Sequence, residues 1–189
     1  MERLPTRLAG PVLLRPRVHG DERGFLLESY RRDAYHAVGV PDDFVQDNHS
    51  RSPRGVLRGM HFQAGAGMAK LVRCARGAIL DVVVDLRRGS PTFGEWESFE
   101  LSDSNQLQAY CPVGFAHGFC VTSDSADVLY KCSSYYDPSL ERSLAYNDPD
   151  VGIEWPDVAL VTSERDARAP RLSEVEREAA FEFGRPHVD

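Results

Sequence analysis

Two histidines stand in sequence surroundings that suit proton transfer beside a bound anion. His61 follows Arg58 by three residues, and Gly59 between them allows another chain segment or a ligand to approach closely. His117 lies near the end of a second glycine-containing stretch, residues 112–119. Imidazole is the side chain whose ordinary pKa lies nearest to neutral pH, so each histidine could exchange a proton under physiological conditions.

The spacing of Pro112, Gly114 and His117 resembles the second sequence motif of the cupin barrels, in which the histidine points into the barrel mouth. In metal-binding cupins the first motif supplies an H-x-H pair and a following Glu as ligands. Here the corresponding pair is His61 and Gln63, and no Glu follows in the next several residues. Because an amide is a poor ligand beside imidazole, too few donors remain for a transition metal. The sequence predicts no catalytic metal.

A closer resemblance rests on seven stretches that occur in order along the chain. They are residues 54–63, 69–72, 81–87, 90–94, 114–119, 130–133 and 155–156. Together they resemble the dTDP-4-dehydrorhamnose 3,5-epimerase family, over roughly residues 8–172. The resemblance implies an all-β, cupin-type jelly-roll barrel. It also implies an isomerase that needs no cofactor and inverts C3 and C5 of dTDP-4-dehydro-6-deoxy-D-glucose, giving dTDP-4-dehydro-L-rhamnose.

The implied reaction removes protons from carbons next to a ketone. It therefore needs a base on one face of the sugar, an acid on the other and a cation near the enolate oxygen. By resemblance His61 is the base, and Asp166 is the carboxylate that fixes its tautomer and raises its basicity. Tyr130 is the implied acid, and Lys70 is the implied cation.

The resemblance also implies residues that bind the nucleotide. Guanidinium groups meet a diphosphate with paired hydrogen bonds, and an aromatic ring can stack on thymine. Tyr136 matches the thymine-stacking aromatic of the family. The other implied substrate-binding residues are Arg23, Glu28, Gln46, Asp47, Asn48, Arg58, His117, Glu141 and Arg165.

Members of this family are generally homodimers in which an N-terminal segment crosses to the neighbouring subunit. The resemblance therefore implies that Arg23 and Glu28 complete the partner's site rather than their own. Such an exchange would also cover strand edges that are otherwise open to aggregation.

The alternation of residues independently predicts a β-barrel to position these side chains. From residue 8 to about residue 155, short segments rich in Val, Leu, Phe and Tyr are separated by turn residues. The clearest strand covers residues 78–86. The all-apolar face of this strand, which belongs in a core, consists of Leu80, Val82, Val84 and Leu86.

Two stretches predict short helices at the periphery of the barrel. The first covers residues 32–38 and is closed by Gly39. The second covers residues 173–183, with Ser173 as its N-cap and Glu176 three residues later, the pattern of a capping box.

The chain length predicts a single domain over residues 1–189. The barrel and its site occupy about residues 8–172, and a C-terminal tail follows over residues 173–189. The stretch 147–157, rich in Pro and Asp, marks the passage out of the sheet.

Composition excludes several classes of protein. With 42% hydrophobic and 27% charged residues the chain is neither disordered nor fibrous. Its net charge of −7 has the wrong sign for a nucleic-acid binder. The sequence contains neither an apolar run of about 18 residues nor a signal peptide, which predicts a soluble, cytoplasmic protein. Four cysteines without C-x-x-C spacing are expected to be reduced thiols: Cys74, Cys111, Cys120 and Cys132.

Three other functions are alternatives to this interpretation of the sequence. A relative from an antibiotic-sugar pathway could act at C3 or C5 alone with the same His and Tyr. A sugar-nucleotide-binding cupin without turnover ranks lower, because such a protein should have lost His61, Tyr130 or Asp166. A metal-dependent oxygenase conflicts with Gln63. The sequence does not separate thymidine from uridine as the nucleoside, or indicate the pathway.

Overall fold

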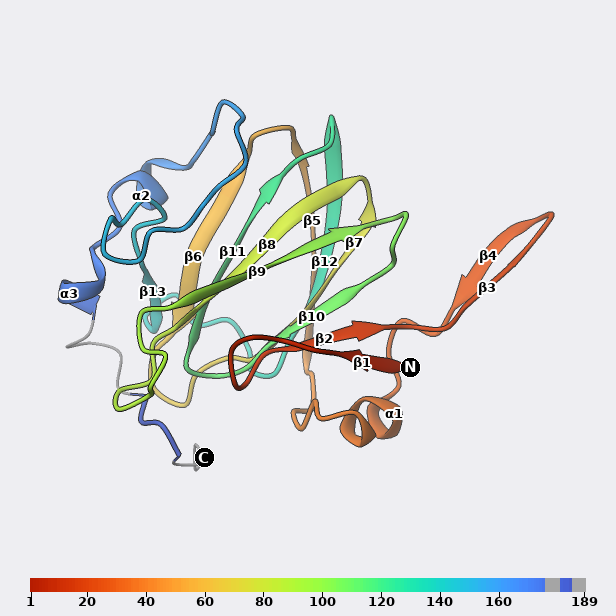
Figure 1. The fold of residues 1–189 in the computed structure, drawn as a ribbon, viewed down its shortest axis with the longest axis horizontal. Coiled ribbons are helices and arrows are strands. Elements are labelled where there is room, and N and C mark those ends of the chain that lie inside the picture. Colours follow the sequence, from red (N-terminus) through yellow and green to blue (C-terminus); the bar gives the residue numbers. More distant parts are fainter. Residues whose placement is uncertain (176–180, 185–189) are drawn as a thin grey trace.

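The computed structural model of the protein describes residues 1–175 and 181–184, which are built around two antiparallel sheets that face each other (Figure 1). The six-stranded sheet contains, in spatial order, β1 (Glu2–Leu4), β2 (Val12–Arg15), β10 (Gln108–Cys111), β7 (Lys70–Arg76), β12 (Ser125–Cys132) and β5 (Gln46–Pro53). The five-stranded sheet contains β13 (Glu141–Ser143), β6 (Leu57–Gln63), β11 (Phe115–Val121), β8 (Ala78–Asp85) and β9 (Trp96–Ser102). This arrangement is a cupin-type jelly roll, which confirms the predicted fold class.

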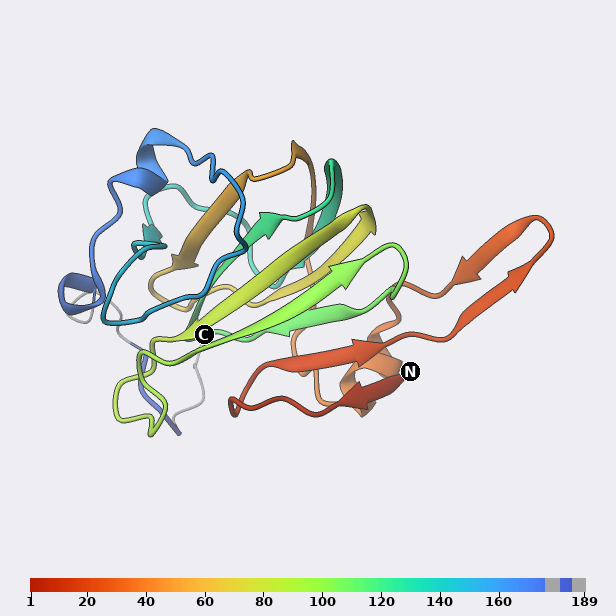
Figure 2. The same ribbon diagram turned by 45° about the horizontal axis from the view of Figure 1, so that its top comes forward.

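Two further strands, β3 (Val18–Asp21) and β4 (Gly24–Leu27), form a hairpin of their own. In Figures 1 and 2 this hairpin extends away from the barrel instead of folding back onto it. Its apolar side chains are open to solvent in the single chain, with Phe25 61% and Leu26 73% exposed. Exposed apolar side chains gathered on a projecting segment are typical of surfaces that contact another molecule.

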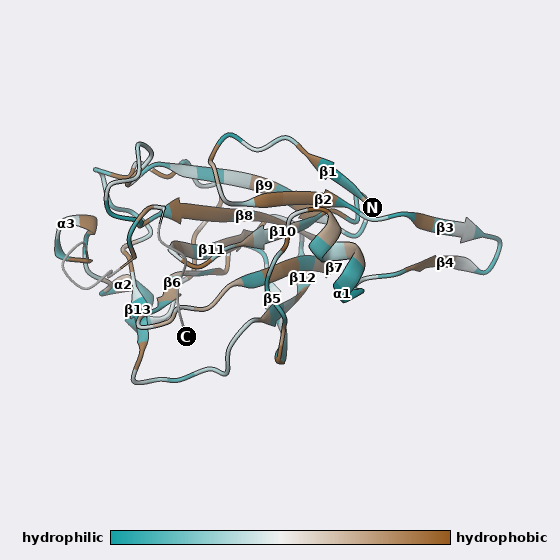
Figure 3. Ribbon diagram, turned by 90° about the horizontal axis from the view of Figure 1, so that it is seen from below, coloured by the Kyte–Doolittle hydropathy of each residue, from teal (hydrophilic) through white to brown (hydrophobic). Residues whose placement is uncertain are grey.

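The apolar residues form three clusters, one between the two sheets and one on the outer face of each sheet. The cluster between the sheets includes Val72 and Phe119. A second cluster, around Met60, lies on the outer face of the five-stranded sheet under the C-terminal segment. A third cluster packs Tyr35 of α1 (Arg32–Ala37) onto Leu71 of the six-stranded sheet. Figure 3 shows the hydrophobic character of β8, which lies between two of these clusters.

The predicted strand at residues 78–86 is confirmed as β8, Ala78–Asp85. Its all-apolar face lies in the outer cluster, as the core placement predicted. The other face points between the sheets, where Ile79 and Val83 join the inner cluster and Asp81 is fully buried. A strand that is buried on both faces needs little alternation, which explains its nearly continuous apolar sequence.

The predicted helix at residues 32–38 is confirmed as α1. Gly39 follows it with a φ of +97°, a conformation that glycine adopts without strain. Tyr35 is completely buried, and its hydroxyl donates to the side-chain amide oxygen of Gln108 at 2.9 Å. The helix therefore covers the outer face of the six-stranded sheet.

The predicted start of the C-terminal helix is wrong. Helix α3 covers Leu172–Val175, so Ser173 lies within it and is not the N-cap. The Leu172 N–H donates to Asp148 at 2.6 Å, and the Arg171 N–H donates to the Glu174 carboxylate at 2.9 Å. These contacts satisfy early N–H groups and start the helix sooner. Glu176, the other half of the predicted capping box, lies outside the described residues.

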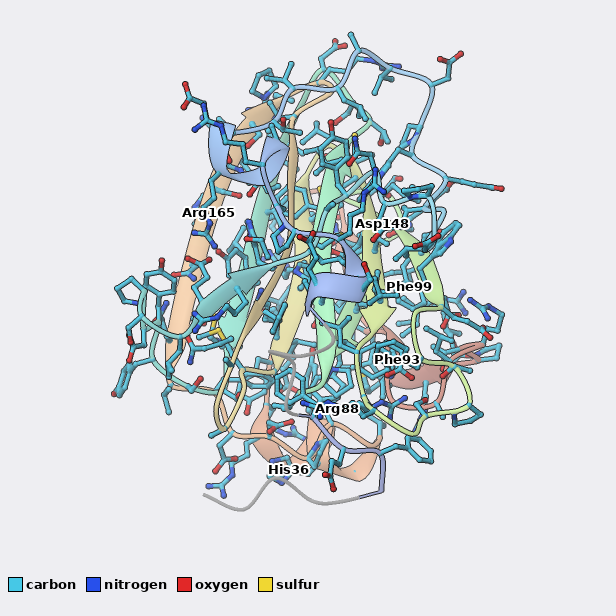
Figure 4. All side chains as sticks on the ribbon, turned by 90° about the vertical axis from the view of Figure 1, so that its left-hand side faces the viewer. His36, Arg88, Phe93, Phe99, Asp148 and Arg165 are labelled. Atoms are coloured by element: carbon cyan, nitrogen blue, oxygen red, sulfur yellow. The ribbon has the colours of Figure 1, made fainter. Side chains whose placement is uncertain are left out.

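The predicted end of that helix is also wrong, because residues 181–184 are not helical. Phe181 is 1% exposed and packs against Phe62, with their ring centroids 6.0 Å apart. Arg88 donates its N–H to Phe181 and accepts from Phe183, forming an isolated bridge with this segment. Tertiary pairing therefore overrides the local helical pattern. Figure 4 labels Arg88 and Asp148, two loop residues that form hydrogen bonds with these C-terminal segments.

The Pro- and Asp-rich stretch and the cysteines lie as the sequence predicts. Residues 147–157 leave the sheet as predicted and contain no strand. All four cysteines are buried and free. Within the part of the chain that the structure describes, no helix has the length and apolar character needed to cross a bilayer.

Candidate active site

The side chain of His61 is held by Asp166 at the open end of the barrel. His61 comes from β6, and Asp166 comes from the short helix α2 (Glu164–Ala167). The His61 Nε2 lies 2.7 Å from an Asp166 carboxylate oxygen. The Asp166 side chain is only 5% exposed, whereas that of His61 is 24% exposed. The carboxylate is thus enclosed, and the imidazole reaches the cavity.

Local pairing explains how a distant segment brings Asp166 to this strand. Val161 forms a parallel bridge with Val56, and its carbonyl accepts the Leu57 N–H at 2.9 Å. Two residues later Ser163 caps α2, because its hydroxyl accepts the Asp166 N–H at 3.1 Å. The cap fixes the first turn of a helix too short to be stable alone.

The pKa of Asp166 is lowered below its ordinary value. Burial by itself raises this pKa, but the hydrogen bond and charge of His61 outweigh that effect. The Gly59 N–H and the Ser163 hydroxyl stabilise the charged form further. Asp166 is therefore ionised at neutral pH and can stabilise a protonated His61.

A second histidine–carboxylate pair lies beside the first. His117 on β11 is directly opposite His61 on β6, and its Nε2 lies 2.7 Å from the Asp81 carboxylate. The two strands approach closely here. A Cβ at Gly59 would lie 2.5 Å from the Cα of Gly118, so the glycine at position 59 is needed for this approach.

Two connected cavities meet at these side chains. The larger one, of about 450 Å³, is lined by His61, Lys70, Tyr130 and Glu141, and further by Arg58, His117, Arg165 and Asp166. The smaller one, of about 90 Å³, shares the first four of these residues. It is further lined by Gln46, Asn48, Gln63, Met68, Cys132 and Tyr136 among others. The shared residues mark the junction at which a bound molecule would meet both histidine and tyrosine.

Tyr130 faces this junction from the opposite sheet to His61. It lies on β12, directly across from Asn48 on β5. The pKa of Tyr130 is raised, chiefly by burial, although a hydrogen bond with Asn48 partly offsets the effect. Its phenol is therefore protonated at neutral pH and can donate a proton.

Glu141 joins two other predicted residues at the rim. It accepts from the Tyr136 hydroxyl at 2.5 Å and from Arg165 at 2.5 Å. Arg165, labelled in Figure 4, also reaches the Ser143 hydroxyl at 3.2 Å. Burial of Glu141 raises its pKa, but these two partners lower it overall.

The structure places three predicted residues away from these cavities. Asp47 points to the other face of β5 from Asn48, in keeping with the alternating burial of that strand, and it forms an ion pair with Lys131 at 2.8 Å. Arg23 and Glu28 are not among the described residues that line either cavity. Arg23 lies at the turn of the projecting hairpin, paired with Asp21 at 2.5 Å.

The donors at the site do not form an obvious metal centre. Among the residues that the structure describes, no three His, Cys, Asp or Glu side chains are grouped to hold an ion. His61 and His117 each have one ring nitrogen on a carboxylate, and Gln63 is bonded to a neighbouring loop. The absence of a catalytic metal stays a prediction.

Sequence reasoning missed three residues that support the site. Ser163 could have been found, because Ser163 and Asp166 have the spacing of a capping motif. Asp81 alternates with apolar residues in a core strand, which gives no signal of its pairing with His117. Gln63 drew notice only as a missing metal ligand, and its contacts depend on a loop 71 residues away.

The family of the chain is shown by its similarity to known proteins. A family model described as dTDP-4-dehydrorhamnose 3,5-epimerase matches residues 5–174. The chain belongs to this epimerase family. The match covers strands β2 to β13 and both histidine–carboxylate pairs, which confirms the resemblance predicted from the sequence.

Individual members of the epimerase family are similar over nearly their full length. The dTDP-4-dehydrorhamnose 3,5-epimerase of Pseudomonas aeruginosa is 50% identical over 175 residues, which are 90% of this chain and 97% of the relative. The crystal structure of the 3,5-epimerase RmlC from Legionella pneumophila, in complex with dTDP-4-keto-L-rhamnose, has a TM-score of 0.93 at 42% identity. That match covers 97% of this chain and 99% of the other.

The epimerase family also includes enzymes of narrower outcome. A 3′-monoepimerase from Streptomyces bikiniensis, solved in complex with dTDP-quinovose, has a TM-score of 0.85 at 40% identity. The match covers 92% of this chain and 89% of that one. The same fold and family therefore include enzymes that invert one carbon and enzymes that invert two.

Proposed function

We propose that the protein epimerises dTDP-4-dehydro-6-deoxy-D-glucose at C3 and C5, giving dTDP-4-dehydro-L-rhamnose, without a cofactor. The observation that carries this proposal is the placement of His61 and Tyr130 on opposite sheets around one junction. Inverting a carbon requires proton removal from one face of the ring and proton return to the other.

His61 acts as the base in this proposal. Its Nε2 is occupied by Asp166, so Nδ1 is the nitrogen left to remove the proton at C3 or C5. The electron pair of the broken C–H bond moves into an enolate whose charge rests on the C4 oxygen. The Lys70 ammonium, at the same junction, stabilises that charge.

Tyr130 then returns a proton to the opposite face of the same carbon. The raised pKa keeps its phenol in the acid form until the enolate is present. After the turnover the phenolate must regain a proton and His61 must lose one, so that a second carbon can react in the same way.

The nucleotide occupies the rim in this proposal. Tyr136 stacks on the thymine, and Arg58 and Arg165 bind the diphosphate with charge-assisted hydrogen bonds. The Legionella relative in complex with dTDP-4-keto-L-rhamnose supports a dTDP-linked sugar as the substrate. Competition between dTDP and UDP for binding tests the choice of thymidine.

The proposal includes a homodimer with exchanged hairpins. The exposed Phe25 and Leu26 need a partner surface, and the position of Arg23 at the hairpin turn suits delivery into a neighbouring site. Hybrid dimers test this exchange: inactive Arg23→Ala and inactive His61→Asn chains should regain activity when mixed and reassembled. A mixture that stays inactive contradicts the exchange.

The proposed cellular location is the cytoplasm. Four buried, free thiols are typical of a reducing compartment and support this location.

The main test is proton NMR of dTDP-4-dehydro-6-deoxy-glucose with the protein in heavy water, without added metal or cofactor. Deuterium at both C3 and C5, together with the L-rhamno product, is the expected result. Deuterium at one carbon alone would indicate the second candidate function, a monoepimerase, which the similarity to the Streptomyces enzyme supports. No exchange at either carbon would contradict both.

A further inference from the structure

Gln63 lies at the end of β6, beside β13, the edge strand of the five-stranded sheet. It is the last residue of β6, only 7% exposed, and its Cα is paired with that of Glu141 on β13. The chain between β12 and β13 forms a loop over residues 133–140, which we call the rim loop. This loop carries Tyr136 and returns to the sheet at Glu141, directly opposite Gln63.

The Gln63 amide uses both of its ends to hold the rim loop. Its oxygen accepts the Asp137 N–H at 3.1 Å. Its nitrogen donates to the Ser134 hydroxyl at 3.3 Å and to the Tyr135 carbonyl at 3.4 Å. A backbone N–H can only donate and a carbonyl can only accept, so these partners determine the orientation of the amide.

A second glutamine holds the same loop from the other sheet. The Gln46 oxygen, on β5, accepts the Tyr136 N–H at 2.9 Å, and the Gln46 nitrogen donates to Asn48 at 3.1 Å. The rim loop is therefore hydrogen-bonded to both sheets. Between these contacts, the Tyr136 hydroxyl is bonded to Glu141, so both the backbone and the ring of Tyr136 are fixed.

We propose that Gln63 is a positioning residue for nucleotide binding, which clamps the rim loop so that Tyr136 is already oriented before the substrate arrives. This inference rests on the proposed function, in which Tyr136 stacks on the thymine. A loop that is ordered in advance loses less conformational entropy on binding, so the clamp raises affinity without contacting the nucleotide. The position that would carry a metal ligand in metal-binding cupins is here used for substrate affinity.

Only an amide of this length can make all three contacts. A Glu at position 63 would keep the bond from Asp137 but would place an anionic oxygen against the Tyr135 carbonyl. A Met would preserve the length and volume of the side chain but lose every hydrogen bond. These two substitutions therefore separate the acceptor function from the donor function.

The test measures dTDP binding by isothermal titration calorimetry in Gln63→Met and Gln63→Glu. Three partly buried hydrogen bonds are lost in Gln63→Met, so we expect its Kd for dTDP to rise by about tenfold. KM should rise by a similar factor, whereas kcat should fall by less than about threefold, because the His61–Asp166 pair is not touched. Gln106→Met, on a turn away from both cavities, is the matched control.

A double-mutant cycle shows whether Gln63 acts through Tyr136. In a Tyr136→Ala background, Gln63→Met should change the Kd for dTDP by less than about twofold, because the ring that it positions is gone. An equal loss of dTDP affinity in both backgrounds, or an unchanged Kd in Gln63→Met, would contradict the proposed role of Gln63 but not the proposed function. If the unmodified protein bound no dTDP, or if Tyr136→Ala bound it normally, the proposed nucleotide binding would be contradicted. The proposed role of Gln63 would then be contradicted too.

Discussion

Asp166 lies 2.7 Å from the Nε2 of His61, although 105 residues separate them in the sequence. The contact depends on Ser163, which caps α2, and on the pairing of Val161 with the start of β6. The carboxylate is buried and ionised, so it accepts a hydrogen bond from Nε2, which in the proposed mechanism leaves Nδ1 as the base. This relationship predicts how the pair responds to substitution.

Asp166→Asn should lower kcat by about 10²-fold, which is less than the effect of removing His61. The amide can still hold the ring but does not stabilise the protonated imidazole. KM should change little, because the Asp166 carboxylate is enclosed and is not one of the proposed nucleotide-binding groups. Steady-state kinetics check this, with Glu164→Gln as a control on the exposed side of the same helix. Full activity in Asp166→Asn would remove the carboxylate from the mechanism.

Tyr130→Phe should separate proton removal from product formation. His61 can still remove a proton and return it to the same face, so deuterium should enter the substrate from heavy water. The L-rhamno product should fall by about 10²-fold or more, because no acid serves the other face. Measuring exchange and product in the same NMR sample checks both effects. Product formation at the normal rate would show that another group is the acid.

Phe181→Ala tests whether the C-terminal tail stabilises the barrel. Phe181 is fully buried against Phe62, so its loss should lower the free energy of unfolding by about 3–5 kcal/mol. Phe183→Ala, at a 43% exposed position, should cost less than about 1 kcal/mol and is the matched control. Urea denaturation measures both. Equal, small effects would mean that the tail is dispensable for stability.

The four cysteines should be inert in the folded protein. Burial raises the pKa of Cys74 to about 11 and that of Cys111 to about 12. Because the thiolate is the reactive form, less than about one Cys74 in a thousand is reactive at pH 8. Titration with a thiol reagent at this pH should modify none in the native state and all four after unfolding. Rapid modification of a native thiol would contradict the buried placement.

The barrel, its clearest strand and its first helix could be predicted because their signals are local. The apolar run at residues 78–86 and the glycine that ends α1 are visible in the sequence itself. The C-terminal helix was predicted wrongly for the opposite reason. Its start depends on Asp148 and its end on Arg88 and Phe62, all of them contacts between distant segments.

In the candidate site, too, residue types could be predicted from the sequence, whereas contacts between distant segments could not. The residue types of His61, Tyr130 and Lys70 could be matched to a family pattern, and the structure gathers them at one junction. Alternation along β5 turns the side chain of Asp47 away from that of Asn48, and its role in binding stays a prediction. The clamp formed by Gln63 also depends on where a loop folds back, which the spacing of residues does not reveal.

The most direct test of the account is deuterium exchange in His61→Asn. In heavy water the unmodified protein should introduce deuterium at C3 and C5 of dTDP-4-dehydro-6-deoxy-glucose. His61→Asn should introduce none at either carbon, while dTDP binding measured by calorimetry stays within about threefold of normal. Exchange at the normal rate in His61→Asn would show that another residue is the base and would contradict the central claim.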